Sequence, residues 1–254
     1  MNIRFLGTGF GPLKTKKRNS KDFRRPASLL IDDRILIDVT PQTLNFADEY
    51  ALSDLYRNVR TILITATDND HFSAETLITL ANRGNTLYVY GDPCMLPYVP
   101  KHPSIVFQPI HTGEIFDVQE AKIIALPTVY RDENGNPAIG YAICTDRSLL
   151  YLASGGFLHP DAWDLLSKLH FDHAILGVPS ADAPNGASTV QAGNFELIKM
   201  LRSIFIDSKT LSDNARCFLT SIPTDKKRSI HEALVALSTD EGFTVAYDSL
   251  YLNI

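Results

Sequence analysis

The most informative stretch of this 254-residue chain reads Ile62-Leu63-Ile64-Thr65-Ala66-Thr67-Asp68-Asn69-Asp70-His71-Phe72. It continues Val59–Thr65, a run rich in Ile and Leu that is typical of a buried strand. A helix is predicted over Ser73–Arg83, because Ser73 suits the N-cap position and Gly84 follows the end of the apolar pattern. The expected order is therefore a strand, a polar loop with carboxylates and a histidine, and a helix.

On both sides of this stretch the chain contains β-rich runs and amphipathic helical patterns. Before residue 150 the further expected strands are Asn2–Leu6, Ala27–Ile31, Arg34–Val39, Thr86–Tyr90, Ile105–Gln108, Ala121–Leu126, Ile139–Cys144 and Leu149–Ala153. After residue 150, strands expected at His173–Val178, Cys217–Thr220 and Phe243–Tyr247 alternate with helices expected near Pro160–Leu169, Val190–Ser203 and Ser229–Leu237. These patterns, without any internal repeat or linker, predict one α/β domain over residues 1–254 with partly antiparallel sheets covered by helices.

The composition is typical of a water-soluble globular protein, with 44% hydrophobic residues, 21% charged residues and a formal net charge of −5. The longest apolar runs, such as Ala27–Ile31 and Ala174–Val178, are far shorter than the roughly 18 residues that span a bilayer. The opening MNIRFLGTG lacks the apolar core of a signal peptide. We therefore expect a cytoplasmic location and no membrane contact. Three widely spaced cysteines also argue against a disulfide framework.

A basic segment at Lys14–Arg25 stands out from the acidic whole. Seven Lys and Arg side chains in this segment are accompanied by a single carboxylate, that of Asp22. Two interpretations remain open: a solvated basic loop, or a surface that contacts RNA or another phosphate-bearing partner. The net negative charge argues against general affinity for nucleic acid.

Two polar groups are predicted to have structural roles. His159 or Asp161 is expected to cap the helix that begins at Pro160. The pair Asn134-Gly135 is expected to form a turn between two strands.

The segment Thr65–His71 resembles the metal-binding turn of the metallo-β-lactamase superfamily, in which a strand leads into Thr-His-x-His-x-Asp-His and a helix. Asp70 and His71 match the end of that motif, whereas Ala66 and Asp68 stand where the motif has its first two histidines. Further resemblance lies, in family order, in Phe5–Gly9, Arg25–Ile31, Leu36–Asp38, Gly140-Tyr141, Leu150–Ser154, Phe218–Ile222 and Val245–Asp248. Within the superfamily the chain is most similar to the group with the phosphonate-pathway cyclic phosphodiesterase and the tRNA 3′-processing nuclease. The resemblance implies a four-layer αββα sandwich.

Active members of this family hold two metal ions, which generate hydroxide and clamp the phosphoryl oxygens. By resemblance, Ser154 takes the place of the bridging Asp, Ser221 that of the last His, and Ala187 that of a substrate-facing His. No histidine lies between His111 and His159, so a further ligand is missing. Alanine has no donor atom, and a neutral hydroxyl replaces a bridging carboxylate poorly. We therefore expect no dinuclear centre and no resident cofactor.

Two functions remain open from the sequence. In the first, the protein has lost hydrolase activity and has a binding or regulatory role. Its old cleft would then hold a small anionic or phosphate-containing ligand beside Ser154, Ala187, Ser188 and Ser221.

In the second, the protein is an active phosphodiester hydrolase with one divalent metal ion held by Asp68, Asp70 and His71. Asp70 and His71 would then be the catalytic residues. The same three side chains also suit a solvated polar turn, so the sequence favours the first function.

Overall fold

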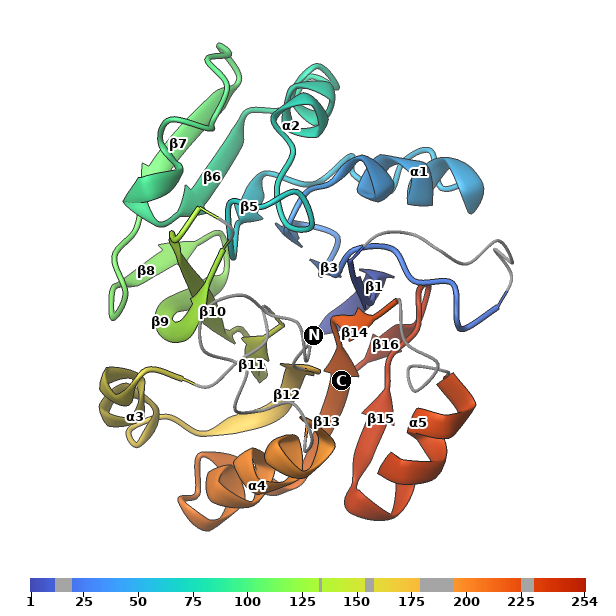
Figure 1. Cartoon of the computed structure of the whole chain (residues 1–254). Coiled ribbons are helices and arrows are strands. Elements are labelled where there is room, and N and C mark those ends of the chain that lie inside the picture. Colours follow the sequence, from blue (N-terminus) through green and yellow to red (C-terminus); the bar gives the residue numbers. More distant parts are fainter. Residues whose placement is uncertain (12–19, 133, 154–157, 179–193, 225–230) are drawn as a thin grey trace.

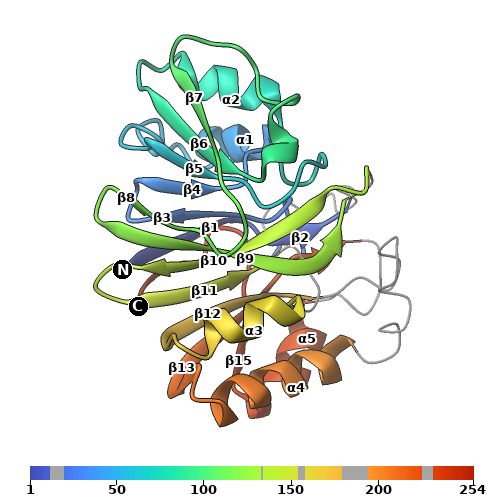
Figure 2. The same ribbon diagram turned by 90° about the vertical axis from the view of Figure 1, so that its left-hand side faces the viewer.

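The computed structural model describes residues 1–11, 20–132, 134–153, 158–178, 194–224 and 231–254. Two seven-stranded sheets face each other, and helices cover the outer face of each (Figures 1 and 2). This arrangement confirms the predicted αββα sandwich. No helix among the described residues is long and apolar enough to cross a membrane.

The first sheet contains the motif stretch. Its spatial order is β16 (Tyr251–Asn253), β1 (Asn2–Gly7), β3 (Ser28–Ile31), β4 (Ile35–Ile37), β5 (Thr61–Leu63), β6 (Leu87–Gly91) and β7 (Ile105–Pro109). Helices α1 (Pro41–Glu49) and α2 (Ala74–Ala81) cover its outer face (Figure 2). Strands β4 to β7 are parallel to one another, so their carboxyl ends lie along one edge of the sheet.

The second sheet has the order β15 (Phe243–Val245), β13 (Leu211–Thr220), β12 (Phe171–Gly177), β11 (Ser148–Leu152), β10 (Pro137–Cys144), β9 (Ala121–Arg131) and β8 (Ile115–Val118). Its outer face is covered by α3 (Pro160–Leu166), α4 (Asn194–Asp207) and α5 (His231–Ser238). Two short strands, β2 (Gly9–Phe10) and β14 (Ile222–Pro223), pair in parallel and link the N-terminal strand to the end of β13. The described residues also include two 3-10 helices, η1 (Pro93–Met95) and η4 (Thr239–Glu241).

The central strands are apolar on both faces because each face meets a separate core. In β11, Leu149 and Tyr151 pack between the two sheets, whereas Leu150 and Leu152 pack against the helices of the outer layer. Side chains alternate between the faces of a strand, so burial on both sides produces a continuous apolar run. This is why Leu149–Ala153 was identifiable as a strand.

Helix α1 and strands β8 and β16 are among the elements that were not predicted from the sequence, because each buries little apolar surface. Helix α1 buries only Thr43, Phe46 and Ala47, and its start depends on a local contact in which Thr40 N donates to Thr43 Oγ1 at 3.0 Å. Strands β8 and β16 are edge strands with mostly exposed or half-exposed side chains. They exist because neighbouring strands supply hydrogen-bond partners.

Gly7 provides a test of the close packing between β1 and the segment before β3. A Cβ atom there would lie 1.9 Å from Pro26 O and 2.9 Å from Arg25 O, both main-chain atoms. We expect Gly7→Ala to lower the free energy of unfolding by at least about 3 kcal/mol, measured by chemical denaturation.

Gly135→Ala is the matched control, because no atom lies within 4 Å of its Cβ position. Only its φ of 79° disfavours alanine, at a cost of about 1 kcal/mol. Equal losses in the two variants would contradict the packing argument.

Candidate functional site

The motif turn lies between β5 and α2, as the sequence predicted. Ser73 Oγ accepts the N–H of Thr76 at 3.2 Å and caps α2. Asp38 follows β4, the strand parallel to β5, so it lies at the same sheet edge as the turn. The main chains also meet there, since Val39 N donates to His71 O at 2.9 Å.

Asp38 holds the turn together through both carboxylate oxygens. Its Oδ1 accepts the N–H of Thr65, and its Oδ2 accepts the Thr65 hydroxyl, each at 2.8 Å. The same Oδ2 lies 2.8 Å from Nδ1 of His71. Asp38 is fully buried and His71 is 2% exposed, so the pair forms a buried contact, whereas Asn69 in the same turn is exposed.

The environment of His71 favours its charged form. Burial lowers the pKa of the imidazole, but the carboxylates of Asp38 and Asp68 outweigh burial and raise that pKa to about 9. Asp68 Oδ1 lies 3.9 Å from His71 Nε2, which is too far for a hydrogen bond. Within the described part of the chain, this buried Nε2 has no hydrogen-bond partner.

The two other acidic residues of the turn are engaged by protein groups. Asp70 Oδ2 accepts the N–H of Gly11 at 2.8 Å, and Asp68 Oδ1 accepts the N–H of Asp70 at 3.2 Å. The hydroxyl of Tyr130 donates to Asp68 Oδ2 at 3.3 Å. Burial raises the pKa of Asp68, although the charge of His71 opposes this shift.

The β9–β10 hairpin fastens the turn from the second sheet. Ile139 N donates to Thr65 O at 2.9 Å. Asp132 accepts a hydrogen bond from the Thr67 hydroxyl and another from the N–H of Asn136, at 2.8 Å. Gly135, with a φ of 79°, forms the hairpin turn that the sequence predicted.

Of the four residues predicted to bind a ligand, Ser221 is the one whose position the structure describes. It follows β13 with a φ of 50°, and its buried Oγ has no hydrogen-bond partner among the described residues. The next residue, Ile222, donates its N–H to Thr8 O at 2.9 Å, and β2 then leads to Gly11 and its contact with Asp70. Through these contacts Ser221 lies on the side of the first sheet where Asp70 is found. Ser154, Ala187 and Ser188 lie outside the described residues.

A pocket of about 720 Å³ opens beside the turn. Its lining is polar and includes the carboxylates of Asp68 and Asp70, the amides of Gln42, Asn69 and Asn134, and the hydroxyl-bearing side chains of Thr67, Ser73 and Tyr98. The volume suits a small ligand.

Among the described residues, the side chains of the motif turn do not supply the donor set of a dinuclear metal centre. Ala66, at the position of the first histidine, is a buried methyl group. Over the described ranges, no three His, Cys, Asp or Glu side chains are grouped closely enough to hold a metal ion. Asp68, Asp70 and His71 thus share a turn without forming such a group.

Several residues of the site were missed by sequence reasoning. Asp38 was noted only as the end of a hairpin, and Tyr130 and Asp132 were not connected with the turn. A signal for Asp38 exists, because a lone acidic residue directly follows a buried strand. No such signal connects Tyr130 or Asp132 with the turn, since their contacts depend on how the two sheets face each other.

The burial of Arg24 and Arg25, at the end of the basic segment, agrees with neither interpretation drawn from the sequence. Arg24 and Arg25 are each 2% exposed, so neither belongs to a solvated loop or to an RNA-facing surface. Arg25 Nη1 donates to Asp248 Oδ2 at 2.9 Å, and Arg24 Nη1 donates to Thr8 Oγ1 at 2.9 Å. Because the Thr8 hydroxyl donates to Asp248 at 2.8 Å, one network joins both ends of the chain. Residues 14–18 lie outside the described residues.

The cap predicted at the start of α3 is confirmed. His159 is the N-cap, and its Nδ1 accepts the N–H of Asp161 at 3.4 Å. This residue is therefore engaged in a local structural role.

Comparison with known proteins identifies the fold. No protein-family model matches the sequence, and no curated protein matches it. Human tRNase Z, short form, superposes with a TM-score of 0.68 at 16% identity, over 100% of this chain and 99% of that chain. The metallo-beta-lactamase fold protein YhfI from Bacillus subtilis has a TM-score of 0.68 at 13% identity, over 99% and 98% of the two chains. Yeast PDE1 has a TM-score of 0.63 at 12% identity, over 100% and 99%.

The chain therefore has the metallo-β-lactamase fold over its full length, in the form shared with tRNase Z and PDE1. This confirms the fold and the structural resemblance predicted from the motif turn and the order of the strands. At such low identities the likeness is one of fold.

Because the pKa of His71 is raised in the folded chain, we expect the free energy of unfolding to depend on pH. The folded chain holds a proton on His71 up to a pKa of about 9, whereas the unfolded chain releases it near the ordinary value of about 6.5. The contribution of His71 is therefore complete below about pH 6.5 and is lost as the pH rises through about 9. We expect the free energy of unfolding, measured by urea denaturation, to fall across this window.

Asp38→Asn should make this slope shallower, because the carboxylate that raises the pKa of His71 most is gone while that of Asp68 remains. It should also cost about 3–5 kcal/mol near pH 7 by breaking a buried pair. Asp33→Asn, in the exposed β3–β4 turn, is the control and should leave the slope unchanged. A slope as steep in Asp38→Asn as in the wild type would contradict the assignment to the Asp38–His71 pair.

Proposed function

We propose that this protein is a phosphodiesterase-like member of the metallo-β-lactamase fold class that has lost the dinuclear metal centre and hydrolase activity. It acts instead by binding a ligand in the pocket beside Asp68 and Asp70. The observation that carries the proposal is the buried methyl group of Ala66 at the position of the first histidine. A metal ion at that position would have one protein ligand fewer, and a water molecule would have to take its place.

The contacts of the remaining motif residues support the same function. Asp70 uses one oxygen to hold Gly11, and Asp68 accepts hydrogen bonds from Asp70 and Tyr130. His71 is tied to Asp38. These residues therefore fix the shape of the turn, and hydrolysis of a phosphodiester would need an activated nucleophile that the described site does not supply.

The proposed ligand is a small phosphate-containing molecule, as the sequence resemblance implies. The described lining of the pocket carries two carboxylates and no Lys or Arg side chain. Among the described residues, binding of an anion then depends on hydrogen-bond donors. Ser221, with its unpartnered hydroxyl, is a further candidate donor.

Metal content and turnover test the loss of the metal centre. Protein purified without chelator should contain less than stoichiometric zinc by elemental analysis, because Ala66 and Ser221 replace ligands. Hydrolysis of bis(p-nitrophenyl) phosphate should stay at background, with or without added manganese or zinc. The reason is that no metal hydroxide forms.

The alternative is a hydrolase with one metal ion on Asp68, Asp70 and His71. It would show metal-dependent turnover that disappears in Asp70→Asn. The matched control is Asp161→Asn, an exposed carboxylate beside a histidine, His159. Turnover lost in the first variant and retained in the second would overturn the proposed function.

A further inference from the structure

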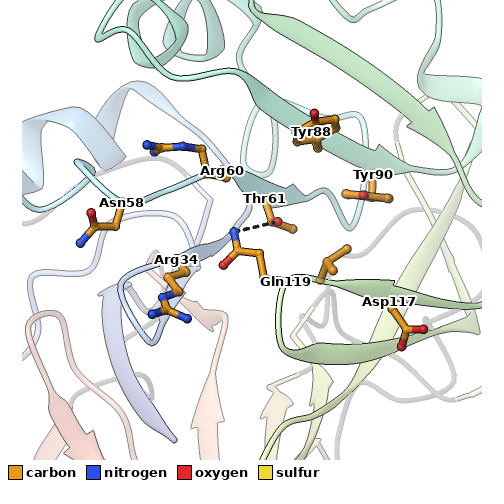
Figure 3. Close-up of a pocket in the computed structure, with 9 residues that line it drawn as sticks. Arg34, Asn58, Arg60, Thr61, Tyr88, Tyr90, Asp117 and Gln119 are labelled. Carbon is orange, nitrogen blue, oxygen red and sulfur yellow. Dashed lines mark hydrogen bonds between the residues drawn. The ribbon is translucent and has the colours of Figure 1, made fainter.

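A second pocket lies at the opposite end of the parallel strands from Asp38 and His71 (Figure 3). Its volume is about 580 Å³. Arg34 and Arg60 immediately precede β4 and β5, and Tyr88 lies near the start of β6. The turn of the β8–β9 hairpin closes the pocket from the second sheet. It shares no residue with the pocket beside Asp68, so it stands apart from the proposed function.

The pocket exists because the core between the sheets ends before the strands do. The rings of Tyr90 and Phe116 stack across the two sheets, with centroids 4.9 Å apart and an interplanar angle of 16°. Tyr88 lies two residues away on the same face of β6 but is 42% exposed. Its aromatic face is therefore available at the open end of the sandwich.

Arg60 is a guanidinium group held in place at this opening. Its Nη1 donates to the main-chain oxygens of Arg57 and Val59, each at 3.0 Å. Among the described residues, no carboxylate forms an ion pair with Arg60, whereas the neighbouring Arg34 pairs with Glu120 at 3.2 Å. A fixed guanidinium without a carboxylate partner is suited to bind a phosphate or carboxylate group of a ligand.

Amide groups complete the pocket, together with the carboxylate of Asp117, which points away from Arg60 and both tyrosines (Figure 3). Gln119 occupies the hairpin turn with a φ of 52°, and its Nε2 donates to Thr61 Oγ1 at 3.4 Å. Figure 3 shows Arg60 and Asn58 on one side of Thr61 and the two tyrosines on the other. A ligand that spans Thr61 therefore meets a cation, an aromatic face and hydrogen-bonding amides.

We propose that this pocket binds a small planar compound that carries an anionic group, with the chemistry and size of a nucleoside monophosphate. The ring packs on Tyr88, as nucleobases stack on aromatic side chains. The phosphate binds Arg60 beside the amide of Asn58, and the amide of Gln119 contacts the edge of the ring. The volume lies in the range of small-molecule sites.

Calorimetric titration of the full chain tests this site with four probes: AMP, UMP, adenosine and ribose 5-phosphate. At least one mononucleotide should bind saturably. Adenosine and ribose 5-phosphate should each bind roughly tenfold or more weakly, because each lacks one of the two main contacts. Absence of saturable binding by both mononucleotides would overturn the proposal, as would equal affinity for adenosine.

Variants locate the site. Arg60→Ala and Tyr88→Ala should each weaken mononucleotide binding roughly tenfold, and Tyr88→Phe should retain the affinity because it keeps the ring. Arg147→Ala and Tyr251→Ala are matched controls, since both side chains are exposed and lie elsewhere. Melting temperatures identify any variant that is unfolded.

Unchanged binding in folded Arg60→Ala and Tyr88→Ala, or equal losses in the controls, would overturn the assignment. If Arg60→Ala does not fold, Arg60→Lys tests the same contact, because lysine keeps the charge without the planar fork. It should bind the mononucleotide more weakly than the wild type. An affinity equal to that of the wild type would overturn the role of Arg60.

Discussion

The buried contact between Asp38 and His71 determines the arrangement of the whole carboxyl edge of the first sheet. Asp38 lies at the end of β4 and His71 near the end of the β5–α2 turn, so one carboxylate sets the position of both. A buried charge without a partner is strongly unfavourable, and each residue neutralises the other. The main-chain bond from Val39 to His71, the position of Thr65 and the start of α2 all follow from this contact.

Further hydrogen bonds support the shape of the motif turn. Gly11 donates to Asp70, Tyr130 donates to Asp68 and Ile139 donates to the main chain of Thr65. A second buried network, of Arg24, Arg25 and Asp248, ties the start of the chain to its end. Burial raises the pKa of Asp248 to about 6 although Arg25 opposes the shift. The fold is thus held by polar networks at its edge and by apolar cores in its centre.

The two ends of the parallel strands offer different chemistry. At the carboxyl end the described lining presents carboxylates, amides and hydroxyls. At the amino end, two arginines and two tyrosines surround the opening between the sheets. A sheet with parallel strands permits this division because residues at opposite ends of a strand never meet. The two pockets therefore have linings of different chemistry.

The sequence by itself determined the strand–turn–helix at residues 62–83 and most central strands. These features are local, because periodicity reports burial and the identity of a side chain fixes its chemistry. Only the tertiary structure decided that Asp38 partners His71, that Tyr130 and Asp132 reach the turn, and that Arg24 and Arg25 are buried. Those contacts join residues far apart in the chain. They depend on which strands are neighbours and how the sheets face each other, and a pattern of single residues does not carry that information.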